Sequence, residues 1–230
     1  MTKAKTKTKA EATKTAFVLR CCREDLSSQN GFVWPDVGGE AICPDWINNN
    51  ECGNGLHGWL YGQGGYSTSS YWNDPAAKWL VVEVEESGIV ILGSKCKFER
   101  GFVRFIGDKT AAAAYLIDHE PRAKDVAVIG ASLVVGDEQA VIVGALGTAT
   151  AGYRGTATAG DRGTATAGDS GTATAGTLGT ATAGDSGELR IRYWDTKAER
   201  YRTVIAYVGE DGIDANVPYR LDDQHKLVKA

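Results

Sequence analysis

The chain has 230 residues, of which 43% are hydrophobic and 23% charged, an ordinary balance for one or two globular domains. Its longest apolar runs, such as residues 126–136, are too short to cross a bilayer, so we exclude a membrane protein. The N-terminus has no apolar leader, and the five cysteines have no framework spacing. These features exclude a disulfide-stapled secreted domain and predict a cytoplasmic protein.

Residues 1–15 form a basic segment that alternates lysine with threonine and alanine. Five lysines and one glutamate give this segment a charge of +4. The net charge of the whole chain is −4, so the remaining residues together carry −8. With no large apolar residue before Phe17, we expect this tail to be disordered. An acidic body does not suit nucleic acid, so only the tail would contact it, and weakly.

Residues 16–124 are expected to form an α+β head domain. Asp108 is a good N-cap for a helix over residues 109–118, which Glu120 and Pro121 would end. Asp74 and Pro75 are expected to start a short helical turn. Apolar and β-branched runs predict strands at residues 17–22, 31–34, 79–85, 88–92 and 96–106.

The segment ECGNGLHG at residues 51–58 is the first candidate site of the head. Cys52 and His57, together with Cys43, offer the ligand types of a zinc site. No Cys-x-x-Cys pair exists and the spacing is irregular, so the alternative is a set of buried thiols beside a hydrogen-bonded histidine. We favour the second interpretation and expect neither a metal nor a cofactor.

Four motifs follow one another in the head: CGNGLHG (52–58), LYGQGGYSTSSYW (60–72), KWLVVEVEE (78–86) and GSKCKFERG (93–101). This order resembles an uncharacterised bacterial and phage domain family with a Cys-x-x-Gly-[Phe/Leu]-His motif. Members of that family can also carry repeats like those of ice-nucleation proteins. The resemblance implies an architecture and a bacterial or phage origin, but no activity. The residues that carry it are Cys52, Gly55, His57, Glu83 and Lys95.

Residues 53–57 and 64–71 are also similar to pieces of ADP-ribosyltransferase-like folds. That resemblance implies a nicotinamide pocket lined by His57, Tyr66 and Ser70, with Glu83 as the carboxylate. The Glu-x-Glu pattern at Glu83 follows equally from the alternation of a strand, and no other catalytic motif is present. The sequence therefore favours a protein without enzymatic activity, with this head as the alternative.

An eight-residue repeat fills residues 131–186, where seven octads include five consecutive GTATAG copies from Gly147. A fixed short period indicates a solenoid, and a glycine every eighth residue excludes helix. Residues 187–194 resemble an eighth strand. Eight residues are too few to circle a core, so we expect two octads per coil, with glycine and aspartate at the corners.

Alternation within each octad divides its side chains between core and solvent. The second and fourth positions point outward, because the last copy holds Glu188 and Arg190 there. Val134 and Ile142 occupy outward positions in the first octads, so we expect the head to cover them. The predicted core comprises Leu133, Val135, Val141, Val143, Ala149, Ala151, Leu189 and Ile191. The predicted binding faces carry Thr148, Thr150, Thr156, Thr158, Thr164, Thr166, Thr172, Thr174, Thr180 and Thr182.

These octads resemble the tandem repeats of bacterial ice-nucleation proteins, whose sixteen-residue coils carry TAG-type strings and outward Thr-x-Thr pairs. The resemblance implies a β-solenoid. It also implies an alternative activity, since a flat lattice of threonine hydroxyls suits ice binding. Threonine on the outside of a strand also reflects plain β-propensity.

Residues 189–230 are expected to form a β-hairpin cap, followed by a small hairpin around residues 222–224. Five aromatic residues would either pack on the last coil or form an exposed interaction surface; we favour packing. They are Tyr193, Trp194, Tyr201, Tyr207 and Tyr219.

The sequence thus predicts a mainly β protein: a basic tail (1–15), an α+β head (16–124), a short β-solenoid (125–188) and a β cap (189–230). Its predicted function is structural, with the threonine-rich solenoid used for self-association or docking to another protein and no contact with a membrane.

Overall fold

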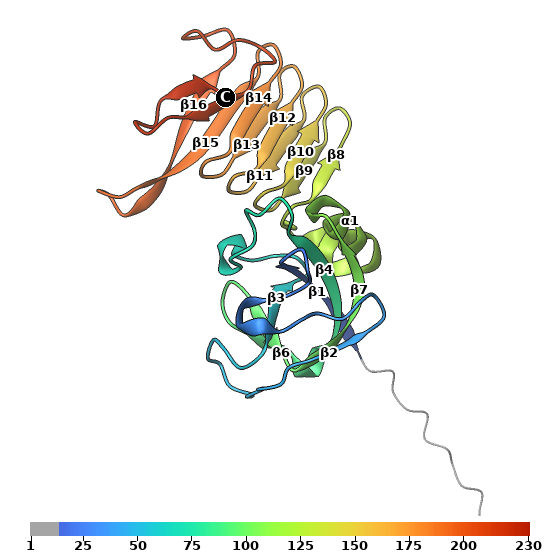
Figure 1. The fold of residues 1–230 in the computed structure, drawn as a ribbon. Helices are drawn as coiled ribbons and strands as arrows, with labels where there is room; N and C mark the ends of the chain where they lie inside the picture. The colour runs from blue at the N-terminus through green and yellow to red at the C-terminus, as the bar shows by residue number, and fades with distance from the viewer. Residues whose placement is uncertain (1–13) are drawn as a thin grey trace, which may run out of the picture.

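The computed structural model describes residues 14–230 and shows a mainly β protein of two parts (Figure 1). A curled sheet with one long helix makes the head, and a flattened coil of short parallel strands rises from it. The expected fold class is confirmed. Thr15, which we expected in the tail, begins the first strand, and residues 1–13 lie outside the described part.

The head is built on one seven-stranded antiparallel sheet in the order β2-β7-β4-β1-β3-β6-β5. Consecutive strands β6 and β7 lie on opposite sides of β4-β1-β3 with a single residue, Glu99, between them. The sheet must therefore curl strongly to let the chain pass. Its strands are β1 (Thr15–Cys22), β2 (Glu40–Ile42), β3 (Leu56–Leu60), β4 (Lys78–Glu85), β5 (Val90–Ile91), β6 (Cys96–Phe98) and β7 (Arg100–Gly107).

Helix α1 (Lys109–His119) packs on one face of this sheet, where Ala112, Ala113 and Leu116 are buried against β1 and β4. The Asp108 side chain accepts a hydrogen bond from the N–H of Ala111, so the predicted N-cap is confirmed. The opposite face packs under loops through a second apolar cluster. Four 3₁₀ turns complete the head: Gln29–Gly31, Tyr66–Thr68, Glu86–Gly88 and Pro121–Asp125.

The strand prediction for the head is wrong in several places. Residues 31–34 form only an isolated bridge between Ser27 and Val33, and residues 96–106 divide into two strands at Glu99. Asp74 begins a turn, because its carboxylate accepts from the N–H of Ala76. Two strands were missed, β2 and β3, and β3 contains the end of the glycine-rich segment 51–58, to which we had assigned no strand.

The solenoid has about four coils of two octads each, as the repeat predicted. Strands of alternate octads pair in parallel and in register, so that Thr148 lies beside Thr164, and Thr164 beside Thr180. Face 1 comprises β8 (Ser132–Val134), β10 (Thr148–Ala151), β12 (Thr164–Ala167) and β14 (Thr180–Ala183). Face 2 comprises β9 (Ala140–Val143), β11 (Thr156–Ala159), β13 (Thr172–Ala175) and β15 (Glu188–Asp195).

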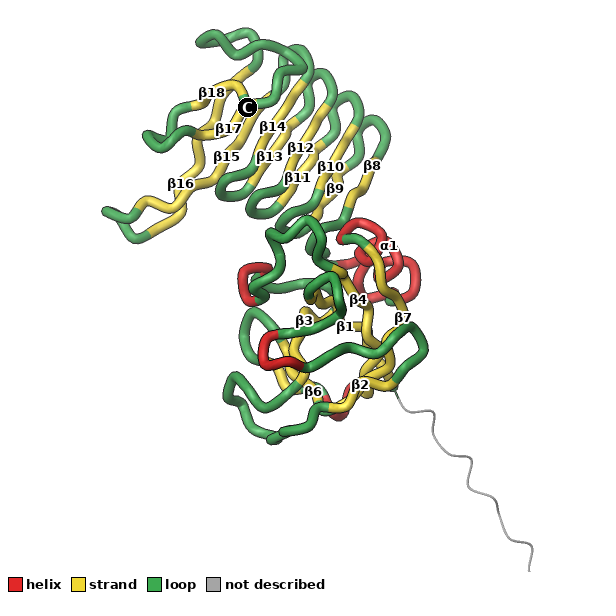
Figure 2. Tube along the Cα trace, in the orientation of Figure 1, coloured by secondary structure: helices red, strands yellow, loops and turns green. Residues whose placement is uncertain are grey.

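Two antiparallel strands close the far end of the solenoid (Figure 2). β16 (Arg200–Tyr207) pairs along the whole of β15, and β17 (Tyr219–Leu221) meets β14 at Ala181. β18 (Leu227–Lys229) pairs with β17, so both expected hairpins are present.

One apolar cluster runs from the head through the solenoid to the cap. It joins Leu19, Trp59 and Leu116 of the head to the alanines of the coils and then to Tyr219. The carbonyl of Gly62 also accepts a hydrogen bond from the N–H of Ile129, at the entrance to the solenoid. Over residues 14–230, no helix combines the length and apolarity needed to cross a membrane.

Candidate functional site

The outward positions of the solenoid place ten threonines in two ladders. On face 1, Thr150, Thr166 and Thr182 lie side by side in three successive coils, and Thr158 lies beside Thr174 on face 2. Strands in a sheet are about 4.8 Å apart and alternate residues on one strand about 6.6 Å, so each ladder is a regular grid of hydroxyl and methyl groups. The grid comprises Thr148, Thr150, Thr156, Thr158, Thr164, Thr166, Thr172, Thr174, Thr180 and Thr182, all exposed or half-buried.

The inward positions form a narrow core of stacked alanines with larger residues at its ends. Ala149, Ala165 and Ala181 have no solvent exposure, and Leu189 and Ile191 fill the interior of the last coil. Val141, Val143 and Ala151 are also buried, whereas Leu133 and Val135 in the first octad are half-buried.

The corners use glycine for close approach between coils. A Cβ on Gly160 would lie 2.5 Å from the backbone nitrogen of Ala145 in the preceding coil, and one on Gly168 would lie 2.7 Å from the carbonyl carbon of Gly152. Gly136, in the first octad, has no atom within 4 Å of such a Cβ. The left-handed backbone at each corner falls on the eighth residue instead, as at Arg154 with φ 52° and Ser170 with φ 54°.

The aspartates of the corners connect coils, a role that sequence reasoning missed. The Oδ1 atom of Asp137 accepts from the N–H of Tyr153, and that of Asp169 accepts from the N–H of Asp185. Asp161 repeats this contact with the N–H of Thr177. The sixteen-residue separation of donor and acceptor is the signal that could have revealed it.

Val134 and Ile142 remain uncovered, contrary to our expectation. Their exposed fractions are 75% and 59%, although both lie in the coil nearest the head. The head meets the solenoid at residues 126–131, and its loop 63–67 lines a cavity of about 510 Å³ together with Ile142, Thr158 and Thr174 of face 2. This contact leaves most of both apolar side chains exposed. Each threonine ladder therefore begins with an exposed apolar side chain.

The prediction that the C-terminal aromatics pack on the last coil is wrong for the first hairpin. Trp194, Tyr201 and Tyr207 are each about half exposed, and Tyr193 stacks on His225. Tyr219 alone among the five is buried, together with Val208 and Ile213. The hairpin of β15 and β16 thus presents the alternative, an exposed aromatic surface.

Face 2 and this aromatic surface are continuous. Thr174 lies beside Arg190, and Arg190 lies opposite Ile205 on β16. Since alternate residues share a face, Tyr201, Ile205 and Tyr207 extend the outward side of face 2 beyond its threonines. Arg192 covers the Tyr201 ring at 4.4 Å.

The head contains a cavity of about 700 Å³, and only some of the predicted site residues line this cavity. His57, Ser70, Cys43 and Cys52 line it, together with Arg20 and Lys95, whereas Tyr66 and Glu83 do not. The four residues of the ADP-ribosyltransferase-like alternative are therefore not assembled in one pocket. The structure likewise gathers no group of three or more His, Cys, Asp or Glu side chains within residues 14–230 at metal-binding spacing, so the zinc alternative has no geometric support.

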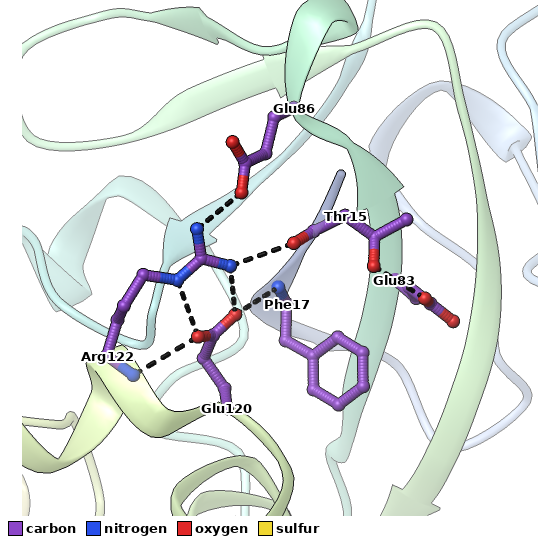
Figure 3. Close-up of polar contacts among 6 residues, drawn as sticks. All are labelled: Thr15, Phe17, Glu83, Glu86, Glu120 and Arg122. Atoms are coloured by element: carbon purple, nitrogen blue, oxygen red, sulfur yellow. Dashed lines mark hydrogen bonds and ion pairs between the residues drawn. The ribbon is translucent and has the colours of Figure 1, made fainter. Parts of the chain in front are cut away.

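Glu83 belongs to a different, structural set of contacts (Figure 3). Its carboxylate accepts from the hydroxyl of Thr15 at 2.7 Å and from Nε of Arg104 at 2.6 Å. Burial opposes ionisation, but these hydrogen bonds outweigh it and lower the pKa of Glu83. The alternation of polar and apolar residues along strand β4 therefore explains why a glutamate occupies position 83.

Beside it, Glu120 and Arg122 fix the segment that leads from α1 to the solenoid (Figure 3). Glu120 is buried and accepts from the N–H of Phe17 and from Nε and Nη2 of Arg122. Arg122 also bonds the carbonyl of Thr15 and the carboxylate of Glu86. Burial opposes ionisation of Glu120, yet the Arg122 hydrogen bonds outweigh it and lower its pKa. This network ties the junction to β1 and to the 3₁₀ turn that follows β4.

Comparison with known proteins gives a match for most of the head. Residues 16–116, the head, match a family model described as "Domain of unknown function (DUF7666)". No solved structure matches the chain.

Part of the chain is similar to proteins named "Ice nucleation protein", and the repeat resemblance is supported by them. The Pseudomonas fluorescens protein is 34% identical over 105 residues, which are 45% of this chain and 8% of that protein. Those of Xanthomonas campestris pv. translucens and Pseudomonas syringae are 31% and 33% identical over 46% and 44% of this chain. The match spans only 7% and 9% of their own lengths.

Proposed function

We propose that this is a structural repeat protein whose solenoid associates with a second copy of itself through β16. The observation that carries the proposal is the position of β16 at the edge of its five-stranded sheet. One side of the strand pairs with β15, and no strand among the described residues pairs with the other. An eight-residue edge with unpaired backbone groups is a ready template for a further strand.

The side chains of β16 support this pairing. Tyr201, Ile205 and Tyr207 are exposed on one face, and proteins that keep such an edge free usually shorten or bulge it. In an antiparallel pair about a two-fold axis at the centre of β16, Arg200 of one copy lies opposite Tyr207 of the other. A guanidinium then meets an aromatic ring at both ends of the interface.

Light scattering coupled to size exclusion tests the proposal. The monomer mass is 24.4 kDa, and we expect twice that mass at high protein concentration. A double substitution, Tyr201→Lys with Ile205→Lys, should give the monomer. The control is Val37→Lys with Ile91→Lys, which alters apolar residues of similar exposure on the head and should leave the dimer intact. A wild-type monomer at every concentration, or a dimer that survives the β16 substitutions, would overturn the proposal.

Ice binding is a second candidate, favoured by the in-register threonines of face 1. This face carries Thr150, Thr166 and Thr182 without an ion pair among them, whereas face 2 ends in the Glu188–Arg190 pair. Thermal hysteresis is the direct measurement. Thr166→Tyr should abolish it by breaking the centre of face 1, and Thr158→Tyr on face 2 should retain it. An absence of hysteresis in the wild-type protein would dispose of this candidate.

A further inference from the structure

The head cavity contains a half-buried cation with no anionic partner. Arg20, on β1, donates through Nη1 to the carbonyl of His57 and through Nη2 to the hydroxyl of Ser28 at 2.8 Å. Its Nε atom is buried without a hydrogen-bond partner, and the Trp34 ring lies 4.8 Å below the guanidinium. No carboxylate among the described residues forms an ion pair with it. Buried charges are ordinarily paired, so this site lacks a counter-charge.

Two lysines close to His57, Lys95 and Lys97, add to the positive charge. Lys95 lines the cavity, and Lys97 is fully buried beneath the glycine-rich loop, with Nζ donating to Oδ1 of Asn49 at 2.6 Å and to the carbonyl of Glu51 at 2.9 Å. Both acceptors are neutral. Among the described lining residues, Asp45 is the single carboxylate, and it already accepts from Cys43 and Asn54.

These positive charges also affect the protonation of His57. Its Nε2 atom is buried and has no partner. Burial, followed by the positive charges of Lys95 and Arg20, lowers the pKa of His57 to about 4. The imidazole therefore stays neutral at pH 7, in the wall of a cavity that Arg20 and Lys95 also line.

We infer that this cavity binds a small organic anion, with a carboxylate or phosphate group at Arg20 and Lys95 and a flat ring against Phe32 and Tyr71. Both rings line the cavity and are half-buried, and Val33 in the same wall is 62% exposed. A volume of about 700 Å³ is that of a small-molecule site with a few converging polar groups. Each terminal nitrogen of Arg20 uses one N–H for His57 or Ser28 and keeps a second, so the guanidinium can still donate to oxygens of either anionic group.

Tryptophan fluorescence of the full chain provides the test, since Trp34 and Trp59 line the cavity. The probes are adenosine monophosphate and benzoate, with adenosine, benzamide and inorganic phosphate as controls. We expect saturable quenching by at least one of the two organic anions and weaker binding of every control, and the better anion identifies phosphate or carboxylate. Arg20→Gln should weaken binding at least about tenfold, as expected for a lost charged hydrogen bond. Arg104→Gln, outside the cavity, should leave it unchanged.

The inference is overturned if neither anion binds saturably, if the neutral analogues bind equally well, or if Arg20→Gln binds normally. If the Arg20 variant does not fold, Lys95→Gln provides the test instead, and we expect it to weaken binding as well. A thermal melt of Arg20→Met separates a binding role from a structural one. We expect the ligand-free variant to melt at or above the wild-type temperature, because an uncompensated cation is removed. A lower melting temperature would show that Arg20 stabilises the fold and would contradict the inference.

Discussion

The solenoid and the head reach stability by opposite means. In the solenoid the inner coils repeat the same contacts: stacked alanines inside, ladders of backbone hydrogen bonds, and glycine at the corners. The head uses contacts that occur once, such as the Glu120–Arg122 network and the buried Lys97. The comparison teaches that a repeated rule can be found in the sequence, because each copy confirms it, whereas a single long-range contact leaves no such pattern.

The largest effect is expected from closing the space at a solenoid corner. Gly160→Ala places a methyl group 2.5 Å from a backbone atom that cannot move aside, and we expect a loss of about 3 kcal/mol or more in the free energy of unfolding. Gly136→Ala, at the same octad position in the first octad, meets no atom within 4 Å and should change stability by less than about 1 kcal/mol. Urea denaturation compares the two, and equal losses would contradict the close-approach explanation.

A smaller loss is expected at the junction of the head. Glu120→Gln removes a buried charge that accepts several hydrogen bonds and leaves Arg122 with one carboxylate partner, which should cost about 2–4 kcal/mol. Because the folded pKa of Glu120 is lowered, its contribution is present above the pKa of an unfolded glutamate and is lost as the pH falls through the folded value.

The matching measurement is urea denaturation of wild type and Glu120→Gln at neutral pH and again below pH ~4. The difference between the two proteins should shrink in acid. A difference that stays constant across this range would show that the carboxylate charge is not what stabilises the junction.

The smallest effect concerns the corner aspartates. Asp169→Ala removes the acceptor for the N–H of Asp185 in the next coil, and a cost of about 1 kcal/mol is expected. Asp185→Ala is the matched control, since its carboxylate accepts no hydrogen bond from the described residues. Thermal melts that shift equally for both variants would count against a bridging role.

Much of the solenoid followed from the sequence. The period of eight, the inward position of Ala149 and the pairing of Thr148 with Thr164 are consequences of alternation and repetition. The exposure of Val134 and Ile142 did not follow, because apolar side chains predict burial and the pattern carries no information on which part of the head lies nearby.

The head was predicted less well, for physical reasons. β3 contains a glycine and a histidine, which are weak strand formers, and it is a strand because β1 and β6 pair with it on both sides. The cavity combines residues of β1, β3 and several loops, so Arg20 could not be assigned to it without the fold. The ADP-ribosyltransferase-like resemblance placed His57, Ser70 and Glu83 together. The first two do line one cavity, whereas Glu83 lies outside it and contacts Thr15.

Backbone hydrogen exchange of β16, measured at low and high protein concentration, tests the proposed association most directly. Pairing of two β16 strands should protect the amides of Arg200–Tyr207 that face away from β15, and only at high concentration. The variant with lysine at positions 201 and 205 should show the same exchange at both concentrations. Wild-type β16 amides that exchange at one rate regardless of concentration would contradict the account.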